Sequence, residues 1–204
     1  MRIVEETAPE ASALPIAELR AHLRLGSGFD LAENPAETAA LVGYLRAAIS
    51  TIEARTGKVL LSRRFRWELD DWRDRLGQPL PLSPVTAIEA LEIDDGAGNR
   101  RLIAADQYAL RPDSQRPWLI PSGTILPSVP RLGFVVITFR AGFGQTWAGV
   151  PPDLAQAAVM LAARFYEDRG QADAGSRAGL PFGVSTLIEK WRAVRTLAGR
   201  GGRT

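Results

Sequence analysis

The sequence predicts an α+β fold, in which N-terminal and C-terminal helices form a helical bundle and an antiparallel β-rich region is inserted between them. Two observations carry this prediction. Apolar residues recur at helical spacing over residues 35–56 and again after Pro151, whereas residues 64–70 alternate between apolar and charged side chains, as in a half-buried strand. The predicted units are N-terminal helices over 1–57, a β-rich insertion over 58–144, a third bundle helix over 145–170, and a hinge, C-terminal helix and basic tail over 171–204.

Composition narrows the class of protein. The chain has 204 residues and is 46% hydrophobic, enough for one domain with a core or for a small domain with an insertion. The absence of cysteine excludes disulfides and thiolate chemistry, and the single histidine, His22, excludes multi-histidine metal sites. The N-terminal residues lack the apolar segment of a signal peptide, and no run of apolar residues is long enough to predict a membrane span.

The net charge is only +2, but the C-terminal tail is an exception. From Lys190 onward the chain carries cations and no acid: Lys190, Arg192, Arg195, Arg200 and Arg203. Such a tail either contacts phosphate or an acidic protein surface, or is simply a solvated chain end. His22, beside the apolar stripe of the first helix, is interpreted as a surface or packing residue, because no catalytic partner motif accompanies it.

The N-terminal third is predicted to be irregular over residues 1–13 and then helical. Pro15 suits the first turn of a short helix over about residues 15–24. A longer helix over 35–56 begins with an N-cap, a proline at N1 and an acid placed for a capping box: Asn34, Pro35 and Glu37. Gly57 supplies the left-handed residue that ends this helix.

From Lys58 the apolar period changes to two residues. One face of the first strand carries Phe65, Trp67 and Leu69, and the other carries Arg64, Arg66, Glu68 and Asp70. Arginines interleaved with aromatics also occur on nucleic-acid platforms. Inward-facing aromatics, with arginines in water beside acids of the same face, explain the pattern more simply, so a half-buried antiparallel strand is predicted.

The rest of the β-rich region is predicted to contain short strands. A strand over 85–93 leads into a hairpin loop over 94–99, and further extended pieces cover 102–110 and 118–120. Several prolines argue against long central strands between them. The loop has acids in common with calcium loops, but it lacks their 12-residue spacing and closing glutamate, so no metal site is predicted.

The stretch from Phe134 to Gly170 is predicted to run from a strand through a turn into a helix. Residues 134–139 are almost continuously apolar, as expected when both faces of a strand are covered. Gly142 and Gly144 match neither glycine-rich phosphate motif and are interpreted as a turn. The helix opens at Pro151-Pro152-Asp153, and small alanines on it allow a close approach of another helix. A glycine-rich hinge over 170–183 precedes a last amphipathic helix over 184–197.

Taken together, these motifs resemble the head–tail connector (adaptor) proteins of long-tailed phages and of phage-like gene transfer agents. The resemblance runs almost from end to end and rests on the order and spacing of the segments. The most specific are Ile137–Gly144, Val150–Leu154 and Phe165–Arg169. Leu180–Val184, with Leu187-Ile188 and Trp191-Arg192, completes the pattern. The chain departs from the family pattern at Asp168, where an asparagine is frequent, and in its arginine-glycine tail, which has no counterpart.

The resemblance implies a structural protein with no catalysed reaction and no cofactor. Such proteins form a ring, usually of twelve copies, on the portal protein in the neck of a virion or phage-like particle, assembled in the host cytoplasm. The ring extends the DNA channel, without sequence-specific DNA binding or membrane contact, and it is a platform for stopper and tail proteins. The residues expected to bind the portal are Phe182, Leu187, Ile188, Trp191, Arg192 and Arg195. Those expected between subunits are Ala157, Ala158, Leu161 and Phe165.

Two other classes of function remain open. A DNA-binding or DNA-packaging accessory protein would use the basic tail, and its affinity for duplex DNA would fall steeply with salt. An enzyme, such as a muralytic or nuclease component, is ranked last, because the sequence has no catalytic triad, metal cluster or paired-carboxylate motif.

Overall fold

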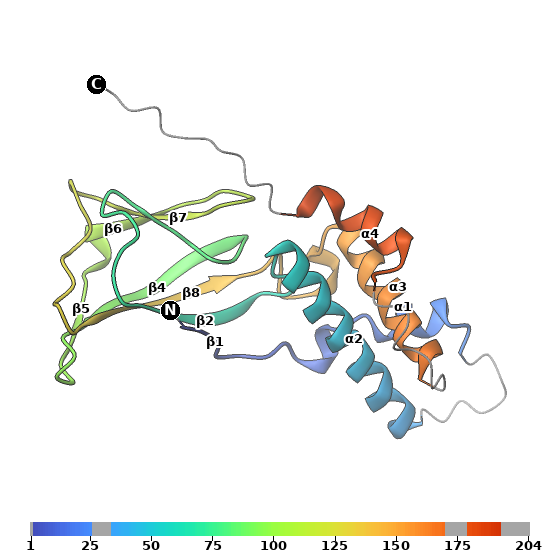
Figure 1. The fold of residues 1–204 in the computed structure, drawn as a ribbon. Coiled ribbons are helices and arrows are strands. Elements are labelled where there is room, and N and C mark those ends of the chain that lie inside the picture. The colour runs from blue at the N-terminus through green and yellow to red at the C-terminus, as the bar shows by residue number, and fades with distance from the viewer. Residues whose placement is uncertain (1, 26–33, 170–178, 193–204) are drawn as a thin grey trace.

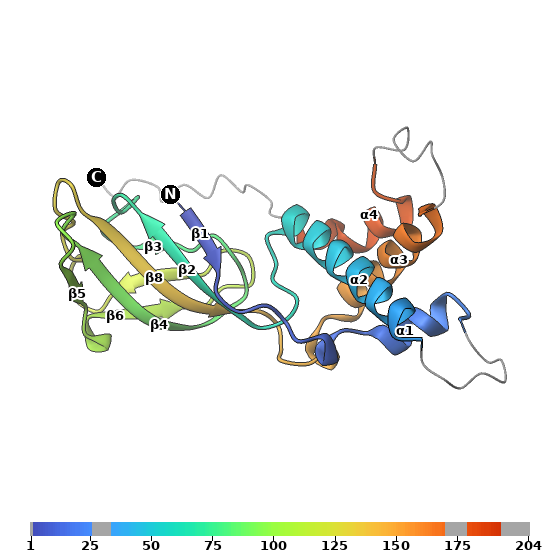
Figure 2. The same ribbon diagram turned by 90° about the horizontal axis from the view of Figure 1, so that it is seen from below.

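The computed structural model describes residues 2–25, 34–169 and 179–192. Figures 1 and 2 show an elongated molecule with the helices gathered at one end and the strands at the other. The buried apolar residues form two clusters, one among the helices and one among the strands. The α+β class is therefore confirmed, with separate cores for its two kinds of element. We call the two parts the helical end and the β end.

The helical end contains α1 (Ile16–His22), α2 (Pro35–Thr56), α3 (Pro152–Asp168) and α4 (Phe182–Ile188). α2 and α3 lie against each other, α1 contacts both, and α4 packs on α3. Their shared core includes Leu19, Leu41, Leu45, Ile52, Leu154, Leu161 and Val184. Burial of these side chains supplies the main stabilisation of this end, at about 1.5–3 kcal/mol for each large apolar side chain.

The predicted start and end of the long helix are confirmed. Asn34 Oδ1 accepts hydrogen bonds from the backbone N–H groups of Ala36 (3.0 Å) and Glu37 (3.4 Å), and so satisfies two of the donors left free at a helix start. Gly57, with φ of 68°, occupies the left-handed position that ends α2. Arg20 of α1 is paired with Glu37 (3.4 Å), which joins the first helix to the start of the second.

The larger sheet of the β end has five strands in the order β1-β2-β8-β4-β5, and every neighbouring pair is antiparallel. The strands are β1 (Arg2–Glu5), β2 (Arg63–Leu69), β8 (Phe134–Ala141), β4 (Val85–Asp94) and β5 (Arg100–Leu102). β8 lies in the centre, and most of its residues are buried, as its continuous apolar run predicts. One face of this sheet carries Phe65, Trp67, Ile137 and Phe139 into the β core.

A smaller sheet of three strands, in the order β3-β7-β6, covers that apolar face. Its strands are β3 (Gln78–Pro79), β7 (Trp118–Pro121) and β6 (Tyr108–Arg111). Leu119 of β7 and Tyr108 of β6 belong to the same buried cluster as Phe139 of the central strand. The β end is therefore a two-layer structure whose core lies between its sheets.

Three sequence-based expectations need correction. Residues 2–5 are not irregular but form β1 on the edge of the larger sheet, where Ile3 lies opposite Trp67. The extended piece over 102–110 is divided: β5 ends at Leu102, a 3-10 turn covers Ala105–Gln107, and β6 belongs to the other sheet. The last helix begins at Phe182, earlier than predicted, and ends at Ile188, before a 3-10 turn over Glu189–Trp191. Most of the predicted hinge, and residues 193–197 of the predicted helix, lie outside the described residues.

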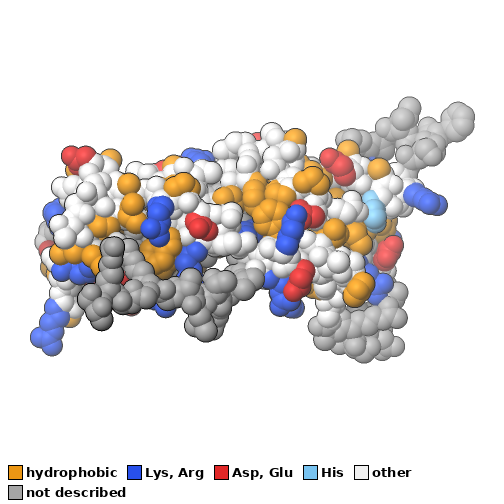
Figure 3. Space-filling view, turned by 90° about the horizontal axis from the view of Figure 1, so that it is seen from above, with side chains coloured by type: hydrophobic (Ala, Val, Ile, Leu, Met, Phe, Trp, Pro, Cys, Tyr) orange, Lys and Arg blue, Asp and Glu red, His pale blue; other side chains and the backbone are white. Residues whose placement is uncertain are grey.

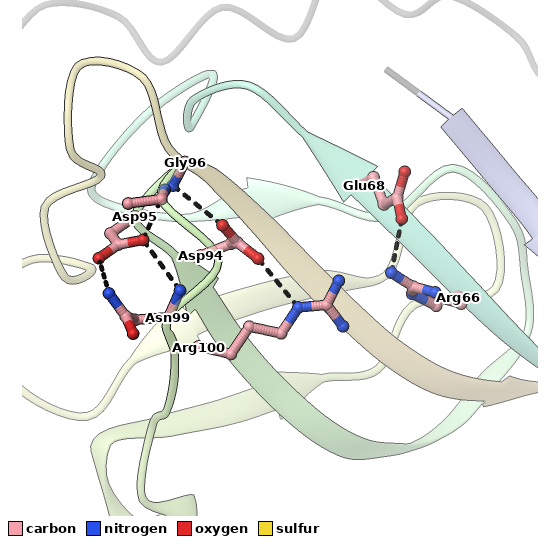
Figure 4. A network of polar contacts seen from close by, with 8 residues as sticks. Arg66, Glu68, Asp94, Asp95, Gly96, Asn99 and Arg100 are labelled. Carbon is pink, nitrogen blue, oxygen red and sulfur yellow. Dashed lines mark hydrogen bonds and ion pairs between the residues drawn. The ribbon is translucent and has the colours of Figure 1, made fainter.

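The outer face of the larger sheet confirms the interpretation of the arginine–aromatic pattern. Arg64 is paired with Glu6 (3.1 Å) and Glu89 (2.9 Å), and Arg140 is also paired with Glu89 (2.9 Å). Arg66 is paired with Glu68 (2.7 Å) on its own strand, as Figure 4 shows. Acids therefore balance these cations. Figure 3 views the molecule from the side of the smaller sheet, and there too basic and acidic side chains lie interspersed.

The hairpin loop between β4 and β5 uses its carboxylates to hold its own backbone (Figure 4). Asp95 accepts hydrogen bonds from Ala97 N–H (2.8 Å), from Asn99 N–H (3.1 Å) and from the Asn99 side-chain amide (2.8 Å). Asp94 accepts one from Gly96 N–H (2.9 Å) and is paired with Arg100 (3.0 Å). In the described parts of the chain, no cluster of acids, histidine or cysteine is placed to hold a metal ion, and no helix is long and apolar enough to cross a bilayer.

A buried ion-pair network joins the helical end to the larger sheet. Arg63 of β2 is paired with Glu53 of α2 (2.5 Å) and with Glu5 of β1 (3.4 Å). The second carboxylate oxygen of Glu53 accepts a hydrogen bond from Leu60 N–H (2.8 Å). Burial raises the pKa of Glu53, although the charge of Arg63 and these hydrogen bonds oppose the rise.

A buried lysine forms a second connection next to the end of α2. Lys58 is only 1% exposed, and its ammonium group donates to Ser83 Oγ (2.8 Å), Gln115 Oε1 (2.8 Å) and the Ser114 carbonyl (2.5 Å). Burial lowers the pKa of this lysine, partly offset by the charge of Asp113. The three acceptors match the three donors of an ammonium group, which makes this burial tolerable.

Candidate partner-binding surface

The C-terminal segment, residues 179–192, contains α4 and lies on α3 at the helical end (Figure 1). Val184 and Ile188 anchor it, because both are buried in the helical core. Gly183 lies where a Cβ atom would be 3.0 Å from Met160 Cε of α3. A side chain at this position would therefore press on the tip of Met160.

A side-chain latch fixes the end of this segment, and we name it the Asp153 latch: Asp153, Lys190 and Trp191. One carboxylate oxygen of Asp153 accepts a hydrogen bond from the Trp191 indole N–H (2.7 Å) and is paired with the Lys190 ammonium group (2.7 Å). The other accepts a hydrogen bond from Leu154 N–H (3.0 Å). The Trp191 ring also packs edge-on against Phe143, with 5.5 Å between ring centroids.

The latch depends on the ionised form of Asp153. Burial by itself would raise the pKa of this carboxyl group, but the hydrogen bonds from Lys190, Trp191 and Leu154 outweigh burial and hold the pKa below its usual value. Sequence reasoning assigned Asp153 only to the start of a helix. Its partners lie far along the chain, and the only available signal was that both segments belong to the family pattern.

The structure separates the six residues predicted to bind the portal. Phe182 is 86% exposed, and Arg192 is exposed as well. Ile188 lies in the helical core, Leu187 and Trp191 are half-buried against it, and Arg195 lies outside the described residues. Phe182 and Arg192 are thus the two whose side chains face solvent, and their contact with a partner stays a prediction.

A small pocket of about 90 Å³ lies between the C-terminal turn of α2 and α4. Its lining residues are Arg55, Leu180, Ser185, Ile188 and Arg192. Within the described residues, no hydrogen bond or ion pair engages the Arg55 guanidinium group, whereas Arg192 is paired with Glu189 at 3.3 Å. The pocket thus presents positive charge beside the apolar side chains of Leu180 and Ile188. Sequence reasoning missed Arg55, because nothing in the local pattern of α2 distinguishes it.

The four residues predicted to lie between subunits have a different environment. Ala157 and Ala158 are fully buried and Leu161 is 2% exposed, all within the core of a single chain, and Phe165 packs on that core. The small alanines of α3 therefore accommodate helices of the same chain. Their role between subunits stays a prediction. Ala157, Ala158 and Leu161 leave almost no exposed surface for a second copy of the chain.

The glycine turn after β8 is confirmed as structural. Gly142 has φ of 137°, and a Cβ atom there would be 2.4 Å from Ser62 Cα. The N–H groups of Gly142 and Phe143 donate to the carbonyls of Pro84 (2.9 Å) and Leu60 (3.2 Å). Because these backbone donors are already used, the turn is not a phosphate cradle.

Comparison with solved structures identifies the chain's relatives. No protein-family model matches the sequence, and no curated protein matches it. A chain from the neck of an empty gene transfer agent (GTA) particle, computed with C6 symmetry, is 50% identical with a TM-score of 0.86. A chain from the virion of a native GTA particle is 50% identical (TM-score 0.83), and one from the neck of a native GTA particle computed with C12 symmetry is 46% identical (TM-score 0.82). Each match covers 98% of this chain and 100% of the other. Identity of this level over nearly the whole length shows that the chain belongs to the neck proteins of gene transfer agent particles.

Proposed function

We propose that the protein is the head–tail adaptor of a phage-like particle. Twelve copies form a ring on the portal protein, extend the channel through which DNA passes, and provide the platform for the stopper and tail proteins. The role is structural and involves no catalysed reaction. The observation that carries the proposal is that relatives 46–50% identical come from neck reconstructions computed with C6 and C12 symmetry.

The structure supports this function through the C-terminal segment. α4 is held on α3 by buried side chains and by the Asp153 latch, so the exposed ring of Phe182 is presented on a fixed support. Aromatic side chains of this kind dominate the binding energy of many interfaces, and burying one stabilises a complex by about 1.5–3 kcal/mol. In this proposal Phe182 contacts the portal.

The direct test is electron microscopy of the purified protein mixed with the portal of the same particle. The expected result is a twelve-copy ring stacked on the portal. A protein that leaves the portal bare at saturating concentration would overturn the adaptor assignment.

A truncation is a poor second test, because removing residues from 170 onward would also remove Val184 and Ile188 from the helical core. The substitution Phe182→Ser is better, since this side chain is exposed. We expect it to weaken portal binding at least about tenfold while leaving the fold intact. Unchanged affinity would remove Phe182 from the interface.

The DNA-binding accessory function ranks second. It draws on the cations that follow Lys190 in the sequence. The arginines of the sheet's outer face do not add to it, because acids pair with Arg64, Arg66 and Arg140. Affinity for a duplex that falls steeply between low and physiological salt would favour this function, and no measurable binding at low salt would reject it.

A further inference from the structure

The pocket between α2 and α4 has the chemistry of a site for an anionic side chain. Arg55 reaches it from α2, and Arg192 and Ser185 reach it from the C-terminal segment. Among the described residues, no acid lines it, and the polar lining consists of two guanidinium groups and one hydroxyl group. Guanidinium groups donate in a planar fork that matches the two oxygens of a carboxylate.

The described part of the chain leaves most of the positive charge of this pocket unneutralised. Among the described residues, nothing neutralises Arg55, and the one ion pair of Arg192 joins side chains that are 55% and 69% exposed. Such an exposed pair contributes little and exchanges readily for a better one. The volume of about 90 Å³ accommodates the head of one aspartate or glutamate with a few waters, but no large group.

The surroundings of the pocket indicate a protein ligand. Leu180 and Ile188 form an apolar part of its lining, and Phe182 lies three residues before Ser185 on α4, on a neighbouring part of the helix surface. Arginine and aromatic side chains together are the usual components of an interface hot spot. A polynucleotide backbone would use the two cations but would leave the apolar surface unused.

We propose that this pocket receives an aspartate or glutamate side chain from the partner that binds the C-terminal segment, with an apolar residue of the same partner on Phe182. The inference rests on the proposed function, and it adds the chemistry that makes the contact specific. The partner segment is therefore acidic and apolar, and Arg55 and Arg192 determine which segment fits.

The test measures the affinity of the full-length protein for the purified portal as a function of salt. We expect Arg55→Gln to weaken binding about tenfold or more and to flatten the salt dependence, while Arg55→Lys, which keeps the charge, retains part of the affinity. The matched control is Arg46→Gln, because Arg46 is also an exposed arginine on α2 but does not line the pocket. The control should bind like the wild type, and all three variants should keep the wild-type melting temperature.

The outcomes separate this inference from the function on which it rests. If Phe182→Ser loses binding but Arg55→Gln binds like Arg46→Gln, the carboxylate site is wrong and the adaptor function stands. If the wild-type protein does not bind the portal, the function itself is wrong. If Arg55→Gln loses affinity for a short DNA duplex but keeps its affinity for the portal, the pocket holds phosphate and the carboxylate proposal is overturned.

Discussion

The two ends of the molecule treat their polar and apolar surfaces differently. At the β end, cations of the outer sheet face are paired within the chain, as Arg64 and Arg140 are with Glu89. At the helical end, the C-terminal segment leaves the ring of Phe182 in solvent and Arg55 without a partner among the described residues. The outer sheet face thus pairs these cations within the chain, whereas Phe182 and Arg55 have no such partner among the described residues.

Exposure of apolar residues alone would not make this distinction. The β end also exposes Leu102 and Leu132, at 66% and 83%. Single exposed aliphatic residues are common on soluble proteins. The α4 region combines the exposed ring of Phe182 with a small pocket lined by Arg55, whose guanidinium group has no partner among the described residues. The proposed partner site rests on this combination.

Among the substitutions considered, Phe139→Ala in the β core should cause the largest loss of stability. Phe139 is fully buried in the central strand and stacks on Phe65 at 5.7 Å between centroids. Removing the ring leaves a cavity and should lower the free energy of unfolding by about 3–5 kcal/mol. Urea titrations followed by tryptophan fluorescence and by helical circular dichroism measure this loss.

We expect both signals to shift together, because Arg63 and Lys58 join the two ends of the molecule. A helical signal that keeps the wild-type midpoint would show that the two ends unfold independently.

The next largest effect tests the ion-pair network that joins the ends. Arg63→Met leaves the Glu53 carboxylate charged, largely buried and without its cation. The substitution should lower the free energy of unfolding by about 3 kcal/mol at neutral pH. The control Arg64→Met removes an exposed arginine from the same strand and should cost less than about 1 kcal/mol. Equal losses for the two variants in urea denaturation would show that the buried pair is not special.

The loss of stability in Arg63→Met should depend on pH in a direction that the pKa of Glu53 determines. The pKa of Glu53 is higher in the folded protein than its usual value, so the folded state binds the proton first as pH falls. The contribution of Glu53 to stability therefore rises as pH falls through this folded pKa toward about 4.5, and declines as pH rises. Without Arg63 the carboxylate is more costly to bury, so the deficit of Arg63→Met should shrink on mild acidification. A deficit that grows under these conditions would contradict this assignment.

A smaller and local effect is expected from Asp153→Asn at the helical end. The substitution removes the charge that holds Lys190 and weakens the bond to Trp191, at a cost of about 1–2 kcal/mol, because Lys190 is largely exposed. Faster hydrogen exchange in α4, with little change in α2, would measure it. Since the pKa of Asp153 is lowered, its contribution is complete above its usual value and is lost as pH falls through the folded pKa. The control Glu189→Gln should leave exchange unchanged.

The smallest effect on stability is expected from Phe182→Ser. The ring is 86% exposed, so the free energy of unfolding should change by less than about 0.5 kcal/mol. Thermal denaturation checks this value, and the portal-binding assay uses the same sample. A large loss of stability would mean that Phe182 packs within the chain, which would remove the contrast between the two ends.

The sequence predicts what local patterns determine. The limits of α2 follow from Asn34 and Gly57, which act through bonds to residues within one turn. The faces of β2 follow from strict alternation, and the structure buries Phe65, Trp67 and Leu69 as predicted. In each case the residue and its physical partner are close in the sequence.

Features that depend on distant segments were not predictable in this way. β1 is a strand only because β2 is beside it, and all four of its residues remain exposed, so no apolar alternation marks it. Lys58 is buried because Ser83 and the 114–115 turn supply acceptors far along the chain. Arg55 lines a pocket only once α4 packs nearby. The residues next to each of these positions in the sequence carry no signal for such contacts.

The Gly142 turn has a mechanical consequence. It connects the central strand to α3, and its backbone is bonded on both sides, to Leu60 and Ser62 and to Pro84. Tension that separates the helical end from the β end therefore does not act on the covalent connector alone. The tension also acts on the hydrogen bonds to Leu60, Ser62 and Pro84, which lie in the segments that lead into β2 and β4. These bonds must break nearly together before the connector can extend. The turn is therefore expected to act as a stiff joint between the two ends of the molecule.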